Sequence, residues 1–262
     1  MVNFLKLSAS YILTVLETIL FKNINAQVNI DKHSIYKNGW KKISNNYCNI
    51  FPLDYEQIKY HSPYSSLIIL NKETIDKLIE EIFTKSNILS EIENETKMKY
   101  CIDFFLYWET RNIPEDKIND QYFANLWHRD NLFSKNVIKL FILSHDTDEN
   151  NGPITWIDKE ESIKFEKNIN SFSKDQKYLI KQNTLIGDKG DACLINPNTC
   201  LHKAGNPKSG HKRQMIMFQL NPSNEFGYRN DLYGKQFFLE PNLPLIRNIG
   251  RKKTKIKIQK HT

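Results

Sequence analysis

The sequence predicts a mainly β protein with flanking helices, built as one domain. Short apolar or alternating segments follow one another through its second half and are separated by polar turns, a spacing typical of a β-sandwich or barrel. Hydrophobic residues make up 40% and charged residues 26% of the 262 residues, which are ordinary values for a chain that buries a core. We therefore expect a single domain over residues 1–246 and a short basic extension over 247–262.

The first predicted element is a helix over 11–21. Its apolar run is too short to span a bilayer and is interrupted by Glu17, so we expect an amphipathic helix that packs on the body of the protein. Contact with a membrane surface is the alternative. The pair Asn38-Gly39 then predicts a tight turn into a strand over Trp40–Ile43, because glycine adopts the positive φ such turns need.

A helix is predicted over Asn71–Ile92 and a strand over Lys99–Trp108. Apolar side chains recur in the first segment at spacings of three and four, and the second is rich in aromatic residues and isoleucine. The remaining predicted strands are Tyr122–His128, Val137–Leu143, Ile154–Ile157, Ala192–Ile195 and Gln214–Leu220. The polar stretches between and beyond them, predicted to be substrate loops, are Ile113–Phe123, Asn131–Asn136, Glu160–Ile186 and Glu225–Asn242.

The positive charge of the chain is concentrated at its end. The formal net charge is +7, from 37 basic and 30 acidic residues, and Arg247–Thr262 contains seven basic residues and no acidic one. Residues 1–246 contain equal numbers of basic and acidic residues, which argues against a nucleic-acid-binding module. No aromatic residues interleave with the basic extension, as a surface that stacks on bases would require. The extension is predicted to be a solvated tail, an added edge strand, or a second contact with an anionic membrane beside the 11–21 helix. The four cysteines form no CxxC pair, which favours a reduced, cytoplasmic protein.

One pair of residues has the spacing of metal ligands. His128 and Asp130 are two residues apart, so both side chains lie on one side of an extended segment. His202, which follows the predicted strand Ala192–Ile195, is the candidate third ligand. Two histidines and one carboxylate leave other coordination positions open, as in non-haem Fe(II) oxygenases.

Two basic residues on predicted strands are candidates for binding a carboxylate. Arg213 begins the alternating strand over 214–220, where its guanidinium can hold a carboxylate through two hydrogen bonds. Lys139 interrupts an otherwise apolar strand and shares a face with Phe141. Because a buried lysine needs a partner, Lys139 either meets a carboxylate, from a cosubstrate or substrate, or is exposed at a strand edge.

Taken in order along the chain, these motifs resemble the phytanoyl-CoA dioxygenase family of iron- and 2-oxoglutarate-dependent oxygenases. The resemblance covers roughly Ile102–Asn221, and the motifs that carry it are His128-x-Asp130, Asn151-Gly152-Pro153, Gly190-Asp191, His202 and Arg213. It implies a double-stranded β-helix (a jelly roll, cupin-like). It also implies that His128, Asp130 and His202 bind Fe(II), and that Arg213 binds the distal carboxylate of 2-oxoglutarate.

Three positions depart from the family pattern. Lys139 and Phe141 stand where relatives often carry glutamine and tryptophan, and Ala204 stands where a small hydroxyl residue is common. Lys139 and Phe141 are therefore expected at the cosubstrate. Tyr107 and Asn125, on strands before the metal motif, are candidates for the pocket.

The resemblance implies oxidative decarboxylation of 2-oxoglutarate with O2, which releases succinate and CO2 while an unactivated C–H bond is hydroxylated. Related halogenases replace the carboxylate ligand by a small residue, so Asp130 favours hydroxylation. The expected substrate is a small polar metabolite, a sugar or a lipid-linked molecule, and no nucleic acid is expected as a partner. The alternative is a metal-binding jelly-roll protein without catalytic activity.

Overall fold

The structure, a computed structural model, describes residues 2–21, 35–120, 122, 124–130, 134–168, 181–223, 226 and 227. Its helices are α1 (Val2–Leu20), α2 (Ile35–Asn38), α3 (Lys72–Ile79), α4 (Ile88–Thr96) and α5 (Lys159–Asn168). Its strands are β1 (Trp40–Ile43), β2 (Tyr55–Ser62), β3 (Ser65–Leu70), β4 (Tyr100–Arg111), β5 (Ile138–Leu143), β6 (Thr155–Ile157), β7 (Gln182–Thr184), β8 (Ala192–Ile195), β9 (His202–Lys203) and β10 (Lys212–Pro222).

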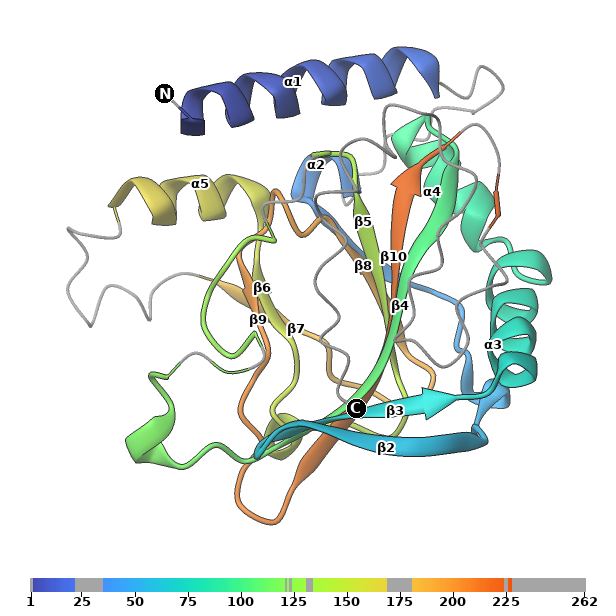
Figure 1. Ribbon diagram of the computed structural model, residues 1–262, viewed down its shortest axis with the longest axis vertical. Coiled ribbons are helices and arrows are strands. Elements are labelled where there is room, and N and C mark those ends of the chain that lie inside the picture. The colour runs from blue at the N-terminus through green and yellow to red at the C-terminus, as the bar shows by residue number, and fades with distance from the viewer. Residues whose placement is uncertain are drawn as a thin grey trace.

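The strands form a larger and a smaller antiparallel sheet (Figure 1). The larger has the order β1-β8-β5-β10-β4-β3-β2, and the smaller has the order β7-β6-β9, to which a bridge between His128 and His202 adds a fourth segment. From β4 onward the chain crosses repeatedly between the sheets: β4, β5, β8 and β10 lie in the larger one, and the His128 segment, β6, β7 and β9 lie in the smaller one. This winding is that of a double-stranded β-helix, which confirms the predicted fold class.

The register of β10 decides which side chains face the interior between the sheets. Phe218 contacts Phe83, outside the larger sheet, with ring centroids 5.1 Å apart. Because side chains alternate along a strand, Arg213, Met215 and Met217 point the other way, toward the smaller sheet. Their direct neighbours on the adjoining strands share this inner face and include Thr110, Trp108, Leu106, Leu143 and Phe141.

Helices cover the outer face of the larger sheet, and Figure 1 shows α3 and α4 along one side of it. α3 begins at Asn71, whose side-chain oxygen accepts a hydrogen bond of 2.8 Å from the Thr74 amide. The single helix predicted over 71–92 is wrong. A π-helical turn over Glu80–Thr84 ends it, and α4 starts afresh at Ile88. The apolar stripe is still buried, so the periodicity identified the packed face correctly although the helix is interrupted.

The strand predicted over 122–128 is also wrong. Ala124 has a φ of 54°, in the left-handed region, which interrupts an extended run, and Asn125 lies in a loop and not on a strand. Of the described residues of this segment, His128 alone joins a sheet. The β2–β3 hairpin, α5 and β7 have no counterpart in the prediction. β7 and all of α5 except its first residue, Lys159, lie within the predicted substrate loop 160–186.

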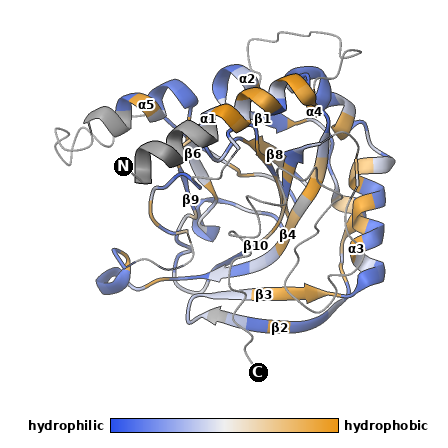
Figure 2. Ribbon diagram, turned by 45° about the horizontal axis from the view of Figure 1, so that its top comes forward, coloured by the Kyte–Doolittle hydropathy of each residue, from blue (hydrophilic) through white to orange (hydrophobic). Residues whose placement is uncertain are grey.

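Helix α1 packs through its polar side. Glu17, 1% exposed, accepts hydrogen bonds from Ser134 and Asn136. Apolar side chains on its other side are exposed and include Tyr11, Ile12, Val15, Leu16, Ile19 and Leu20. Figure 2 shows this hydrophobic stretch of α1 at the periphery. Among the described helices, none has the length and apolar character needed to cross a membrane. The basic extension 247–262 lies outside the described residues.

Candidate metal centre

Backbone pairing brings the three predicted ligands together. His128 and His202 exchange two backbone hydrogen bonds, of 3.1 and 3.0 Å, and the amide of Asp130 donates to the carbonyl of Pro197. His202 also lies directly opposite Trp156 of β6, whose ring packs on Trp40 of the larger sheet at 5.2 Å. Since paired residues share a face, His202 and His128 point into the interior between the sheets.

The donor atoms converge on one point. Oδ1 of Asp130 lies 3.5 Å from Nε2 of His128 and 3.3 Å from Nε2 of His202. One donor atom from each of the three residues lies within 4.8 Å of the other two. Ligands about 2.1 Å from a divalent metal ion and at right angles to each other are about 3 Å apart. The cluster therefore fits a metal ion held from one side by two nitrogens and one oxygen.

Both imidazoles are oriented by their other nitrogen. Nδ1 of His128 lies 2.8 Å from the carbonyl of Leu126, and Nδ1 of His202 lies 3.1 Å from the carbonyl of Cys200. When Nδ1 carries the proton and donates it to a carbonyl, Nε2 keeps its lone pair for a metal. The two histidines thus have the same arrangement, each bonded to the carbonyl two residues before it.

The electrostatics of the cluster favour the protonation states that metal binding needs at Asp130 and His202, but not at His128. Burial would raise the pKa of Asp130, but the Lys139 charge and hydrogen bonds from both histidines hold it far below its usual range. Burial lowers the pKa of His202. Burial acts in the same direction on His128, yet its hydrogen bonds with Asp130 and Leu126 and the Asp130 charge together outweigh burial and raise its pKa. Asp130 is therefore a carboxylate, and His202 is neutral at pH 7.

Lys139 meets a carboxylate, but that carboxylate belongs to the protein. Its ammonium forms an ion pair with Oδ2 of Asp130, although Oδ2 has no partner in hydrogen-bonding geometry among the described residues. Lys139 shares the inner face of β5 with Phe141, as the strand period predicts. In this structure the partner of Lys139 is therefore Asp130, where the sequence pointed to a cosubstrate or substrate carboxylate.

Arg213 is a buried cation that lacks an acidic partner within the described part of the chain. Its side chain is fully buried; Nη1 donates to the carbonyl of Gly152 and Nη2 to Oγ1 of Thr110 at 3.2 Å. Nε has no hydrogen-bond partner among the described residues. Burial lowers the pKa of Arg213 to about 10, so the guanidinium still carries its charge at pH 7. A buried positive charge with an unused donor is suited to a bound carboxylate.

The structure separates the other predicted pocket residues. Phe141 lies on the inner face, with its ring 6.4 Å from that of Trp108. Tyr107 lies opposite Ile216 and so points to the outer face of β4, away from Arg213. Asn125 uses its side chain to hold its own loop, through bonds to Ile118, Asp120 and Tyr122. The register of β4 therefore argues against Tyr107 as a pocket residue, and the pocket role of Asn125 stays a prediction.

Thr110 and Gly152 are contacts of Arg213 that the sequence did not assign. Gly152 belongs to the Asn-Gly-Pro motif, but only the structure shows that its carbonyl accepts from the guanidinium. Thr110 lies two residues beyond the predicted strand end at Trp108, because β4 extends to Arg111. If the predicted strand is continued past Trp108, the alternation of side chains places Thr110 on the same face of the strand as Trp108.

No family model matches the chain, and no curated protein matches it, so the resemblance to the phytanoyl-CoA dioxygenase family stays a prediction. Solved structures similar to it include SnoN, described as a non-heme alpha-ketoglutarate-dependent epimerase from nogalamycin biosynthesis (10% identity, 72% of this chain and 81% of that one, TM-score 0.48). They also include HygX from Streptomyces hygroscopicus with nickel and 2-oxoglutarate (11%, 77% and 91%, 0.43) and EctD from S. alaskensis with iron (10%, 86% and 94%, 0.47). The fold is assigned from the chain's own sheet order: a double-stranded β-helix with a His-Asp-His cluster and a buried arginine in its interior.

Proposed function

We propose that this protein is an Fe(II)- and 2-oxoglutarate-dependent dioxygenase that hydroxylates an unactivated C–H bond of a small molecule. The observation that carries the proposal is the coexistence, in one interior, of a three-residue metal cluster and a buried arginine without an acidic partner among the described residues. A protein that binds only a metal ion would not need Arg213. A 2-keto acid needs both the metal and a buried cation, because one end of it binds the metal and the other end is a free carboxylate.

His128, Asp130 and His202 would hold the iron. Iron with 2-oxoglutarate and O2 supplies the oxidising chemistry, with succinate and CO2 as products. The protein's own residues prepare that site before anything binds. The Leu126 and Cys200 carbonyls aim the two imidazoles, and the inward-pointing Oδ1 of Asp130 completes the set.

Arg213 would anchor the cosubstrate. Its two occupied donors, to Gly152 and Thr110, fix the plane of the guanidinium, and Nε remains for an incoming carboxylate. The apolar inner-face neighbours, Trp108, Met215 and Phe141, exclude water around this charge and so strengthen the interaction. We assign Phe141 to the wall of the cosubstrate site. We assign Lys139 as the ion-pair partner of Asp130.

We assign hydroxylation, and not halogenation, because the ligand set includes a carboxylate, that of Asp130. The substrate we propose is a small polar metabolite, a sugar or a lipid-linked molecule. A cytoplasmic setting agrees with the four cysteines, each of which is a free thiol. The alternative is a jelly-roll protein that binds metal without catalysis.

The test is succinate release from 2-oxoglutarate by the Fe(II)-loaded protein in the presence of O2. We expect turnover in the wild type, none above background in Asp130→Ala, and wild-type turnover in Asp188→Ala, an exposed aspartate outside the cluster. Isothermal titration with Ni(II) and then 2-oxoglutarate separates the alternatives. Binding of Ni(II) without binding of 2-oxoglutarate would favour the non-catalytic protein and overturn the proposal.

A further inference from the structure

Lys139 is a cation at the metal cluster to which the proposed reaction gives no role. Its ammonium contacts Oδ2 of Asp130, and Oδ1 of the same carboxylate lies 3.5 Å from Nε2 of His128 and 3.3 Å from Nε2 of His202. The ammonium is therefore one carboxylate group away from the point on which the ligands converge. Oδ2 has no partner in hydrogen-bonding geometry among the described residues, so the contact is an ion pair without a hydrogen bond.

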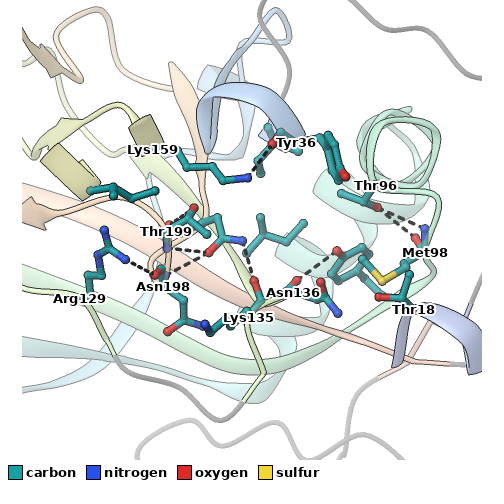
Figure 3. A pocket seen from close by; sticks show the side chains of 15 residues that line it. Thr18, Tyr36, Thr96, Met98, Arg129, Lys135, Asn136, Lys159, Asn198 and Thr199 are labelled. Atoms are coloured by element: carbon teal, nitrogen blue, oxygen red, sulfur yellow. Dashed lines mark hydrogen bonds between the residues drawn. The ribbon is translucent and has the colours of Figure 1, made fainter. Parts of the chain in front are cut away.

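The other basic side chains near the ligands in the chain lie elsewhere. Arg129 and Lys135 line a separate cavity beside α1 (Figure 3), and none of the three ligand residues lines that cavity. Lys203 lies over the ring of Trp127, with its ammonium 4.9 Å from the ring centroid. Within the described part of the chain, Lys139 is therefore the basic residue that contacts the cluster.

Lys139 and Arg213 lie at opposite ends of the interior. Lys139 pairs with Gln219 of β10, six residues beyond Arg213, so the two positions are about 20 Å apart along that strand. The guanidinium is held at its own end by Thr110, the direct neighbour of Arg213 on β4. With its distal carboxylate at Arg213, 2-oxoglutarate would place its other carboxylate on the metal, whose charge offsets it. The cosubstrate thus leaves no carboxylate for Lys139.

The charges of the loaded interior do not balance without a further anion. Asp130 carries one negative charge, and Lys139 and Arg213 carry one positive charge each. With both histidines neutral, a divalent metal ion adds two positive charges and 2-oxoglutarate adds two negative ones. One positive charge remains in excess, and without Lys139 the site would be neutral. An excess charge in a buried site is costly unless a counter-ion joins it.

The ammonium of Lys139 is largely removed from water but can be reached from solvent. Its side chain is 13% exposed and that of His128 is 33% exposed, so the cluster opens to solvent on the His128 side. Two neighbours on the same inner face, Phe141 and Ile195, are apolar and buried. A low local dielectric strengthens the attraction of the ammonium for an anion.

We propose that the substrate is a monocarboxylic acid whose carboxylate binds to Lys139 beside the metal. This inference rests on the proposed function and narrows its substrate class. A monoanion matches the single excess charge, whereas a phosphate ester carries nearly two negative charges and would need a second cation. The carbon atoms next to the carboxylate are then held beside the metal, so the oxidised C–H bond is expected near the acid group.

The test measures binding and does not depend on turnover. Co(II)-loaded protein with 2-oxoglutarate is mixed under nitrogen with acetate, propionate or cyclohexanecarboxylate, and each is compared with its amide. Relaxation of the probe protons by paramagnetic Co(II), followed by NMR, reports binding close to the metal, and a titration gives the affinity. We expect at least one carboxylate to bind about tenfold or more tightly than its amide, which is the effect of a charge-assisted hydrogen bond.

Variants of Lys139 test its role directly. Lys139→Met should abolish the preference for a carboxylate over its amide, and Lys139→Arg should retain most of it. Lys135→Met removes an exposed positive charge four residues earlier, and as the matched control it should behave like the wild type. The proposal is overturned if no carboxylate is preferred over its amide. It is also overturned if the preference persists in Lys139→Met, as it would for an anion bound to the metal ion itself.

Calorimetry with 2-oxoglutarate separates this inference from the proposed function. Co(II)-loaded wild type and Lys139→Met should bind 2-oxoglutarate with similar affinity. Loss of 2-oxoglutarate binding in Lys139→Met alone would assign the lysine to the cosubstrate and overturn the substrate inference, while the proposed function would stand. Loss of binding in the wild type as well would overturn both.

Discussion

Replacing Arg213 by methionine is expected to abolish 2-oxoglutarate binding without destabilising the ligand-free protein. Burial lowers the pKa of Arg213 from 12.5 to about 10, which corresponds to about 3 kcal/mol against the charged form in the folded state. Methionine removes that cost, but it leaves the Gly152 carbonyl and the Thr110 hydroxyl without their donor, at about 1–3 kcal/mol each. The opposing effects are of similar size, so the melting temperature should change by only a few degrees.

The stabilisation of the folded protein by bound 2-oxoglutarate is expected to be larger than this change, and it raises the melting temperature. At a concentration one hundred times its Kd, a ligand stabilises the folded protein by about 3 kcal/mol. For a chain of this size, that corresponds to a rise in melting temperature of about 6–10 °C. We expect this rise on addition of 2-oxoglutarate to the Ni(II)-loaded wild type, and none for Arg213→Met, because the distal carboxylate has lost the buried cation that we assign to it.

Thermal unfolding of Ni(II)-loaded protein, followed by fluorescence with and without 2-oxoglutarate, measures both effects. Lys212→Met is the matched control: it removes one positive charge next to Arg213 in the chain, but Lys212 is exposed and pairs with Glu109. It should keep the full response to 2-oxoglutarate. An equal response in Arg213→Met would refute the assignment of Arg213, and a large drop in its ligand-free melting temperature would refute the energetic balance.

Three further predictions concern a glycine, a lysine and the C-terminal extension. Gly152→Ala should cost about 2 kcal/mol or more in unfolding by denaturant, because its φ is 64° and a Cβ would overlap the backbone of Asn206 and Pro207. Gly210→Ala, with positive φ but open space around it, should cost less; equal losses would contradict the packing argument. Lys139→Met should tighten Co(II) binding severalfold in calorimetry, since the ammonium competes for the carboxylate of Asp130, and weaker binding would show instead that Lys139 supports the ligand. We propose peripheral membrane contact through the exposed apolar side of α1 and the extension 247–262, so deletion of 247–262 should reduce binding to anionic vesicles, and unchanged binding would exclude a role for the extension.

Local patterns predicted much of the barrel. The strand over Ala192–Ile195 is found with the predicted bounds, and the strands around Lys139 and Met215 are found within a few residues of theirs. Each is a short apolar run whose period of two is visible without knowledge of the fold. The strand over 122–128 failed because a left-handed residue, Ala124, interrupts a run whose composition is typical of a strand. The helix over 71–92 was overestimated because a π-turn leaves the apolar stripe almost unchanged.

The orientation of α1 is a feature that the sequence alone does not predict. Its composition indicates an amphipathic helix, but composition does not say which side meets the protein. The buried side carries Glu17, since Ser134 and Asn136 offer it hydrogen bonds from a distant segment. A buried carboxylate is stable only where such donors exist. The apolar side is consequently left exposed.

The sequence by itself determined which side chains act together within one segment: His128 with Asp130, Lys139 with Phe141, and Arg213 with the inner face of its strand. These groupings follow from the period of an extended chain, which is a local property. Only the tertiary structure decided what each group faces. Asp130 meets Lys139, Arg213 meets Thr110 and Gly152, and Tyr107 points away, because these relations depend on strand register and on the winding of two sheets. Such contacts join residues far apart in the chain, and no pattern within one segment specifies them.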